Sequence, residues 1–223
     1  MLLRLLRGGS ALEVIVGLFS SIFVVFCTLP IHEFAHAVTA DKLGDPTARR
    51  QGRLTLNPLA HLDIWGCLMI LLVGYGYAKP VPVNMRNFKN PKAGMAIVSF
   101  AGPLSNLIMA FVFVLLYRIC GIYLADTNAS QAFSLFFYYA ANINVALAVF
   151  NLLPIPPLDG SRIALALIPN EYYYKIMQYE RYIMIALFVL LLTGALSIPL
   201  NYLTNLVMRG ISLLGALIVR SPA

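Results

Sequence analysis

The chain has 223 residues, of which 60% are hydrophobic and 11% are charged, and its formal net charge is +7 at pH 7. Soluble domains carry about 25% charged residues, so this composition excludes an ordinary soluble protein and indicates an integral membrane protein. The length allows a single membrane domain, residues 1–223. Positive charge in membrane proteins concentrates in cytoplasmic loops, so we expect no nucleic-acid partner.

Apolar segments long enough to cross a bilayer follow one another along the chain. A hydrocarbon layer about 30 Å thick needs roughly 20 apolar residues per helix. We therefore expect an all-α polytopic membrane protein with about five transmembrane helices, at residues 11–40, 93–120, 131–153, 181–196 and 198–220. Residues 64–78 are also apolar, but they are fewer and are interrupted by glycines, which favours a re-entrant or interfacial segment.

Two short segments after the first helix have the pattern of extended chain. Residues 53–56 alternate between polar and apolar, and residues 79–84 contain two prolines, which strands tolerate at a sheet edge. The sequence thus predicts a small β-hairpin or strand region. Such a region could receive an unwound substrate by strand addition or could only shield a site, and the pattern favours neither.

The first helix carries the sequence His32-Glu33-Phe34-Ala35-His36 near its C-terminal end. Residues four apart lie on one face of a helix, so both histidines can bind a single Zn²⁺ while Glu33 takes a proton from water beside it. Catalytic zinc usually has three protein ligands and one open position. A third ligand must therefore come from elsewhere in the chain.

Asp159 is the candidate for that third ligand. It follows an apolar helix that ends in a proline-rich break. An acidic residue at membrane depth is costly and is normally paired or bound to metal. The alternative is that Asp159 caps the helix that follows it. Two histidines and one carboxylate form a recognised type of catalytic zinc site, which favours the role of ligand.

Three motifs together resemble those of the site-2 proteases, zinc metalloproteases that cut peptide bonds within membranes, and especially their minimal members without a PDZ domain. The motifs are His-Glu-x-x-His at residues 32–36, Gly-x-x-x-Asn at residues 102–106 and Asn-x-x-Pro-x-Pro-x-Leu-Asp-Gly at residues 151–160. The resemblance covers nearly the whole chain. It implies one zinc ion per chain, bound by His32, His36 and Asp159, with Glu33 as the general base and acid.

The resemblance also implies that Asn151 holds the substrate or its oxyanion. A neutral amide can donate a hydrogen bond to an oxyanion without the cost of burying a charge. The alternative is an asparagine that only bonds neighbouring helices. Gly102 and Asn106 share one helical face, where we expect them to support the site, the glycine by allowing close helix approach and the amide by bonding across the interface.

The charge of the segment after the first helix predicts the side of the membrane on which the site lies. Basic residues outnumber acidic ones over residues 41–92. By the positive-inside rule this segment faces the cytoplasm, and the adjoining metal site lies toward the cytoplasmic side of a prokaryotic cell membrane. Arg4 and Arg7 would then lie outside, which conflicts with the rule.

The predicted function is zinc-dependent hydrolysis of peptide bonds in the transmembrane segments of other membrane proteins, as in regulated intramembrane proteolysis. Its partners would be those substrates and the lipid bilayer, and the oligomeric state stays open. One alternative is a transporter or ion-conducting protein with a translocation path formed by buried histidine and aspartate, since ionisable residues within the membrane are also typical of such proteins. Another is a zinc-binding membrane scaffold without catalytic activity.

Overall fold

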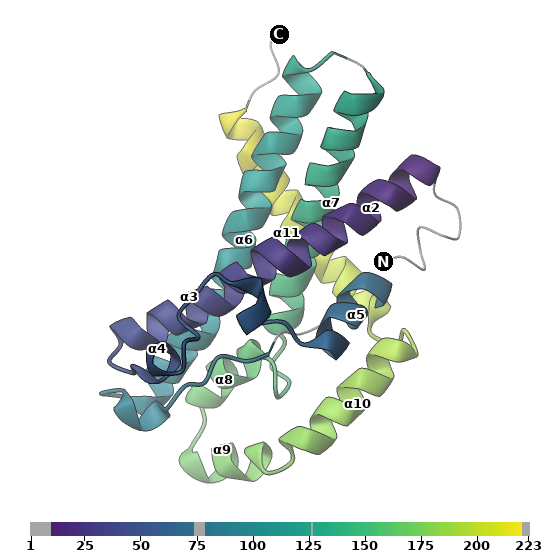
Figure 1. Cartoon of the computed structure of the whole chain (residues 1–223). Helices are drawn as coiled ribbons and strands as arrows, with labels where there is room; N and C mark the ends of the chain where they lie inside the picture. The colour runs from purple at the N-terminus through teal and green to yellow at the C-terminus, as the bar shows by residue number, and fades with distance from the viewer. Residues whose placement is uncertain (1–9, 74–78, 126, 220–223) are drawn as a thin grey trace.

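A computed structural model of the chain describes residues 10–73, 79–125 and 127–219, and these residues form an all-helical fold (Figure 1). The elements are, in chain order, α2 (Ala11–Phe23), the π-helical turn η1 (Val24–Thr28), α3 (Leu29–Lys42), α4 (Thr47–Arg50), η2 (Pro58–Ala60), α5 (Ile64–Val73), η3 (Met85–Asn87), α6 (Pro91–Tyr123), α7 (Asn128–Asn151), α8 (Asp159–Ala166), α9 (Asn170–Met177), α10 (Glu180–Leu192) and α11 (Ser197–Ile218).

The first long helix runs through α2, η1 and α3 without a break. Pro30 has no N–H and cannot donate the backbone hydrogen bond that an α-helix requires at its position. The preceding turn, Val24–Thr28, is π-helical, with a wider turn where the proline enters the helix. The helix therefore continues past Pro30 into α3, which carries the two histidines of the zinc motif.

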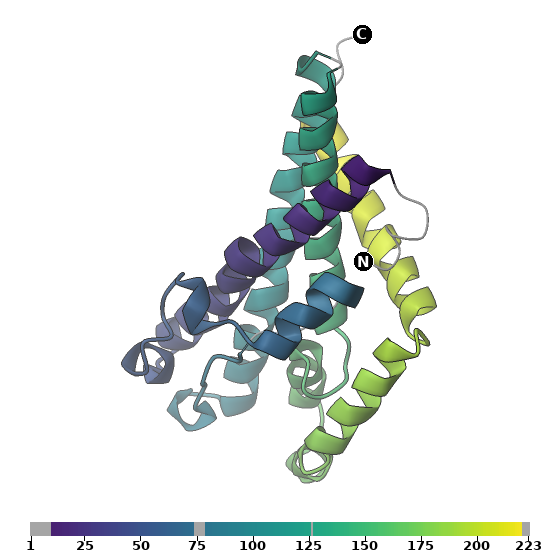
Figure 2. The same cartoon turned by 45° about the vertical axis from the view of Figure 1, so that its right-hand side comes forward.

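A pair of long helices, α6 and α7, forms the centre of the molecule. They pack along each other, α3 and α8 pack on α6, and α2 and α11 pack on α7 (Figures 1 and 2). Small residues of α7, among them Ala140, Ala141 and Ala148, are completely buried and allow the helices to approach closely. In both views α10 lies across from α3, with α8 between them.

The number of membrane spans differs from the expected five. All five predicted helices form, but the described residues contain three helices that are long and apolar enough to cross a membrane, residues 11–42, 91–123 and 128–151. The pair α10 and α11 adds a fourth only if the two count as one span, bent by 85° at the break between them. With 13 residues, α10 is only about 20 Å long. Gly194, at a φ of +77°, lies in the turn that follows it.

The predicted strand region is wrong for the part of the chain that the structure describes, which contains no strand. Residues 79–84 are extended, but their ends bond to loops instead of to a neighbouring strand. Pro80 and Pro82 have no N–H to donate to a strand ladder, which limits pairing on this segment. The apolar segment before it forms the ten-residue helix α5, and its last residues, 74–78, lie outside the described residues.

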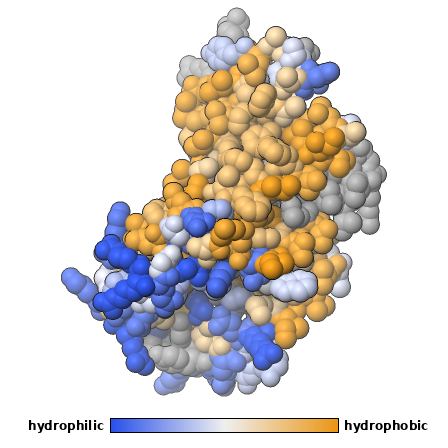
Figure 3. All heavy atoms as spheres, viewed as in Figure 1, coloured by the Kyte–Doolittle hydropathy of each residue, from blue (hydrophilic) through white to orange (hydrophobic). Residues whose placement is uncertain are grey.

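Hydrophobic and hydrophilic residues occupy different parts of the surface (Figure 3). The middle of the molecule, along the long helices, is hydrophobic. Large side chains of these helices, such as Phe19 of α2 and Ile108 of α6, are exposed. Hydrophilic residues gather at the lower end, over α4 and the neighbouring loops. An apolar surface of this kind suits contact with lipid, so the chain is an integral membrane protein with several apolar spans.

Candidate metal centre

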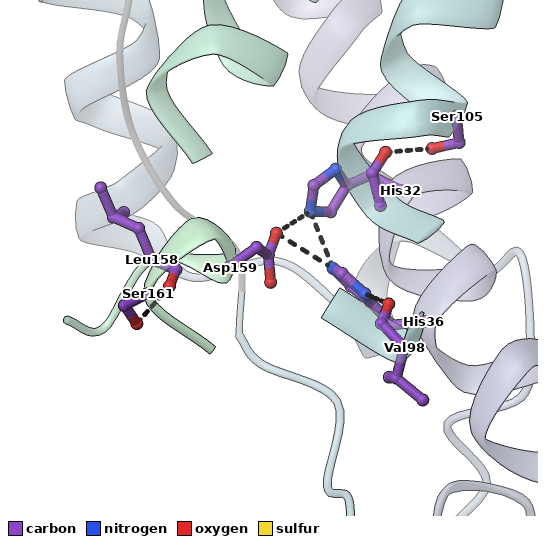
Figure 4. A network of polar contacts seen from close by, with 8 residues as sticks. His32, His36, Val98, Ser105, Leu158, Asp159 and Ser161 are labelled. Carbon is purple, nitrogen blue, oxygen red and sulfur yellow. Dashed lines mark hydrogen bonds and ion pairs between the residues drawn. The ribbon is translucent and has the colours of Figure 1, made fainter. Parts of the chain in front are cut away.

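Helix α3 places His32 and His36 one turn apart, both buried and both facing α6 and α8 (Figure 4). The two imidazole Nε2 atoms lie 3.0 Å apart. Glu33, between them in sequence, is also buried and lines the same cavity. The spacing of the motif on a helix thus gives the paired histidines that the sequence predicts.

Asp159 is brought to the histidines by the sharp connection between α7 and α8. Its Oδ2 atom lies 3.4 Å from Nε2 of His32 and 3.4 Å from Nε2 of His36. Leu158 occupies the N-cap position of α8, and Asp159 is the first helical residue, so the capping alternative does not describe its side chain. A Cβ atom on Gly160 would lie 2.1 Å from the carbonyl oxygen of Leu152, so only glycine permits this close packing.

The donor set of these three side chains fits a zinc ion. Tetrahedral bonds of about 2.0–2.1 Å separate two donor atoms by about 3.3 Å, which is close to the distances between the three side chains. Two imidazole nitrogens and a carboxylate oxygen are donors that zinc accepts, and they leave an open position. Within the described part of the chain, His32, His36 and Asp159 are the only group of three or more such side chains whose ligand atoms come this close.

A backbone contact from α6 sets the orientation of His36. Its Nδ1 atom lies 2.8 Å from the carbonyl oxygen of Val98. A carbonyl only accepts hydrogen bonds, so Nδ1 carries the proton and leaves the lone pair of Nε2 directed at Asp159 and His32. Among the described residues, His32 Nδ1 has no equivalent partner.

Gly102 of α6 lies directly against both imidazoles. A Cβ atom at this position would come within 2.3 Å of His36 Nε2 and 2.6 Å of His32 Cε1. Asn106, one turn later, is completely buried, but the hydrogen bond expected across the helix interface is absent, since neither of its side-chain atoms has a partner within the described residues. The two residues share a helical face, yet only Gly102 touches the candidate ligands.

A cavity of about 470 Å³ connects the three candidate ligands with the two predicted catalytic residues. It is lined by His32, His36, Asp159, Glu33 and Asn151, which come from α3, α7 and α8. Among the remaining walls, the sequence predicted a place near the site only for residues 79–84, as part of a region that receives the substrate or shields the site. These walls include Met69 of α5, Pro80, Val81 and Val83 of the extended segment, Arg162 of α8, and Met184, Leu187, Phe188 and Leu191 of α10.

Comparison with known proteins agrees with this geometry. The pattern of peptidase family M50 matches residues 118–194, the part of the chain that contains Asn151 and Asp159. YwhC of Bacillus subtilis is 44% identical over 174 residues, which cover 77% of this chain and 80% of YwhC. Rip2 of Mycolicibacterium smegmatis is 33% identical over 138 residues, 60% of this chain and 51% of Rip2.

An archaeal relative, MJ0611 of Methanocaldococcus jannaschii, is 32% identical over 136 residues, which cover 59% of this chain and 62% of MJ0611. All three relatives carry provisional names as zinc metalloproteases. No solved structure matches the chain. The identity to YwhC over most of both chains, together with the converging His-His-Asp donors, shows that the chain belongs to peptidase family M50, the zinc metalloproteases of the site-2 protease type.

Proposed function

We propose that this metalloprotease is an intramembrane endopeptidase, a single membrane domain that cleaves transmembrane segments of other membrane proteins in regulated proteolysis. One observation carries the proposal. The donor atoms of His32, His36 and Asp159 converge beside a cavity that Glu33 also lines, and both histidines lie on a helix long and apolar enough to cross a membrane. A site on such a helix is suited to peptide bonds that lie within the bilayer.

In the proposed mechanism, His32, His36 and Asp159 hold one zinc ion per chain. The bound ion would lower the pKa of a water molecule and polarise the scissile carbonyl. Glu33 accepts the proton from that water and returns it to the amine of the leaving chain. Asn151 donates a hydrogen bond from its side-chain amide to the carbonyl oxygen as negative charge develops on it.

The proposed substrate must unwind before it is cut. The carbonyl groups of a transmembrane helix are hydrogen-bonded within the helix, and lipid supplies no other donor for them. Substrates should therefore carry helix-weakening residues such as glycine or proline close to the cut. The largely apolar walls of the cavity, including Val81 and Phe188, suit the side chains that an unwound transmembrane segment presents.

The proposed site of cleavage is toward the cytoplasmic side of a prokaryotic cell membrane. The basic residues of the segment after α3 support this side by the positive-inside rule, and they belong to the hydrophilic end of the molecule (Figure 3). Bacterial and archaeal relatives support a prokaryotic membrane. Membership of a protease family argues against the alternative of a transporter, whereas an inactive zinc-binding scaffold is left for experiment to exclude.

The test compares wild-type protein with Glu33→Gln in lipid vesicles that contain a single-span peptide with glycine near its cytoplasmic end. We expect both proteins to hold about one zinc per chain, and only the wild type to cut the peptide. Equal cleavage by Glu33→Gln would contradict the mechanism. Zinc binding without cleavage of any membrane peptide by the wild type would support the scaffold instead.

A further inference from the structure

Asp45 is a completely buried carboxylate in the loop that follows α3, outside the catalytic cavity. Burying a charge is costly unless hydrogen bonds compensate for it, so the partners of such a group indicate what it does. Its Oδ1 atom accepts hydrogen bonds from the backbone N–H and the hydroxyl of Thr47 and from the side-chain amide of Asn87. Its Oδ2 atom accepts from the backbone N–H of Asn84 at 2.7 Å.

These hydrogen bonds connect two walls of the catalytic cavity. Asp45 follows the helix that carries His32, Glu33 and His36, whereas Asn84 ends the extended segment 79–84, whose residues Val81 and Val83 line the cavity. The two partners are 39 residues apart in sequence. Asp45 therefore fixes one end of the extended wall relative to the helix of the metal centre.

The other end of the extended segment is fixed separately. The Arg53 guanidinium donates to the carbonyl oxygen of Lys79 at 2.6 Å, and the Lys79 N–H donates to the carbonyl oxygen of His61 at 2.8 Å. His61 is itself completely buried, and its Nε2 atom lies 2.8 Å from the carbonyl oxygen of Thr55. The segment is thus held at both ends by loop residues, while its middle faces the cavity.

A small apolar cluster links this wall to the orientation of His36. Ala40 of α3, Phe88 of the loop before α6, and Val98 of α6 are buried together, and Leu43 and Val83 pack against them. Val98 is also the residue whose carbonyl oxygen bonds His36 Nδ1. The position of the extended segment and the orientation of one candidate ligand therefore depend on the same packing.

We propose that Asp45 is a positioning residue for substrate binding, which holds segment 79–84 at a fixed distance from α3 so that an unwound chain fits between them. This inference rests on the proposed function and deepens it. The segment makes no strand ladder within the described residues, so its position depends on the hydrogen bonds at its two ends. Loss of Asp45 widens or misaligns the cavity without removing any group that touches zinc.

The sharpest test is Asp45→Asn, which changes one oxygen into an amino group at almost constant volume. If the remaining oxygen faces Thr47 and Asn87, the new amino group faces the Asn84 N–H, and two donors cannot bond. The matched control is Asp41→Asn, the same chemical change four residues earlier, at a residue of α3 that is paired with Arg49 instead. Both substitutions are made in the Glu33→Gln background, in which the peptide is bound but not cut.

Three quantities are measured in lipid nanodiscs: the Kd for a single-span peptide, the zinc content, and the hydrogen exchange rate of the Asn84 amide. We expect Asp45→Asn to raise the Kd at least tenfold and to speed exchange at Asn84, with the zinc content unchanged. Asp41→Asn should change none of the three. Asn87→Ala, which removes one donor and spares the Asn84 bond, should give a smaller rise in Kd and keeps the test usable if Asp45→Asn fails to fold.

Three results would overturn the inference. Faster exchange at Asn84 with an unchanged Kd would show that the segment does not position the substrate. Unchanged exchange would show that the bond to Asn84 does not hold the segment, and loss of zinc would show that Asp45 acts through the metal centre. If Glu33→Gln with Asp45 intact binds no peptide, the proposed function fails, and this result is distinct from the other three.

Discussion

Gly102 and His36 are in such close contact that a Cβ atom on the glycine would lie 2.3 Å from His36 Nε2, well inside van der Waals contact. The same atom would lie 2.6 Å from His32 Cε1. The absence of a side chain at this position of α6 therefore allows both imidazoles to point their Nε2 atoms at Asp159. Helix packing and ligand geometry are determined here by one residue.

Gly102→Ala should therefore disrupt the metal centre. The added methyl group must displace at least one imidazole, so we expect zinc content and peptide cleavage to fall at least tenfold, measured by metal analysis and by proteolysis in vesicles. Gly121→Ala is the matched control on the same helix, where a Cβ atom would meet nothing within 4 Å. The control should keep its zinc, and alanine there should stabilise α6 by up to about 1 kcal/mol. Full zinc content in Gly102→Ala would contradict this account.

Asn151→Ala should separate catalysis from metal binding. If its amide stabilises the developing oxyanion, removing it lowers kcat by about 10²–10³-fold, as for the loss of one oxyanion donor in other hydrolases. KM and zinc content should change little, because the amide is not among the donor atoms that converge on the metal position. Asp159→Ala provides the contrast, with loss of zinc and of activity together. If Asn151→Ala raises KM and leaves kcat unchanged, the residue binds the substrate instead of its oxyanion.

Local patterns in the sequence predicted the helices and the converging ligands well. The geometry of a helix is enough to predict that His32 and His36 share one face, and apolar segments of sufficient length predict membrane helices. The count of spans was less predictable, because α10 ends early at a turn and α11 carries polar residues such as Asn201 and Arg209. Whether α10 and α11 together form one span depends on the angle between them, which no local pattern records.

The walls of the cavity depend on contacts between distant parts of the chain, and the sequence predicted a place near the site only for residues 79–84. Residues 79–84 were predicted to be an edge strand because strands tolerate proline at a sheet edge. A strand needs a partner, however, and this segment bonds to the loop residues Asp45 and His61. Asp45 had no motif to mark it. Its carboxylate bonds residues 39 and 42 positions later, and no local pattern records contacts at this separation.

The stability of the protein in acid should depend partly on Asp45. Burial alone would raise the pKa of this carboxyl, but hydrogen bonds from Thr47, Asn84 and Asn87 outweigh burial and hold its pKa below the usual value. A pKa lowered in the folded state contributes stability that is complete above the unfolded value of about 3.9 and is lost as the pH falls through the folded value. The contribution should thus be present at pH 7 and should decline in strong acid.

The measurement is the difference in unfolding free energy between wild type and Asp45→Asn, in detergent, from pH 7 to the lowest pH at which both stay folded. We expect Asp45→Asn to cost about 1–3 kcal/mol at pH 7, because the Asn84 N–H loses its acceptor. The difference should narrow below about pH 4 as the wild-type carboxyl takes up its proton. The difference in unfolding free energy cancels the titration of groups that both proteins share. If this difference grew larger in acid, the pKa of Asp45 would not be lowered in the folded state.

The ion pair between Arg162 and Glu180 should control the placement of α10. Its atoms are 2.9 Å apart, the side chains are 20% and 30% exposed, and it joins α8, which begins with Asp159, to the start of α10. Leu187 and Phe188 of α10 line the cavity, so a shift of this helix changes the space available to substrate. Arg162→Glu and Glu180→Arg should each raise KM several-fold through repulsion between like charges, with the zinc content unchanged.

The double variant Arg162→Glu/Glu180→Arg should restore much of the lost affinity, because it restores opposite charges across the same gap. A partly exposed pair of this kind is expected to couple by on the order of 1 kcal/mol in a double-mutant cycle. The control is the reversal of Arg49 and Asp41, a pair whose arginine is largely exposed and whose side chains do not line the cavity. Its reversal should leave KM unchanged. A double variant no better than either single variant would show that Arg162 or Glu180 acts on the substrate directly, since the charge of one residue would then matter without the other.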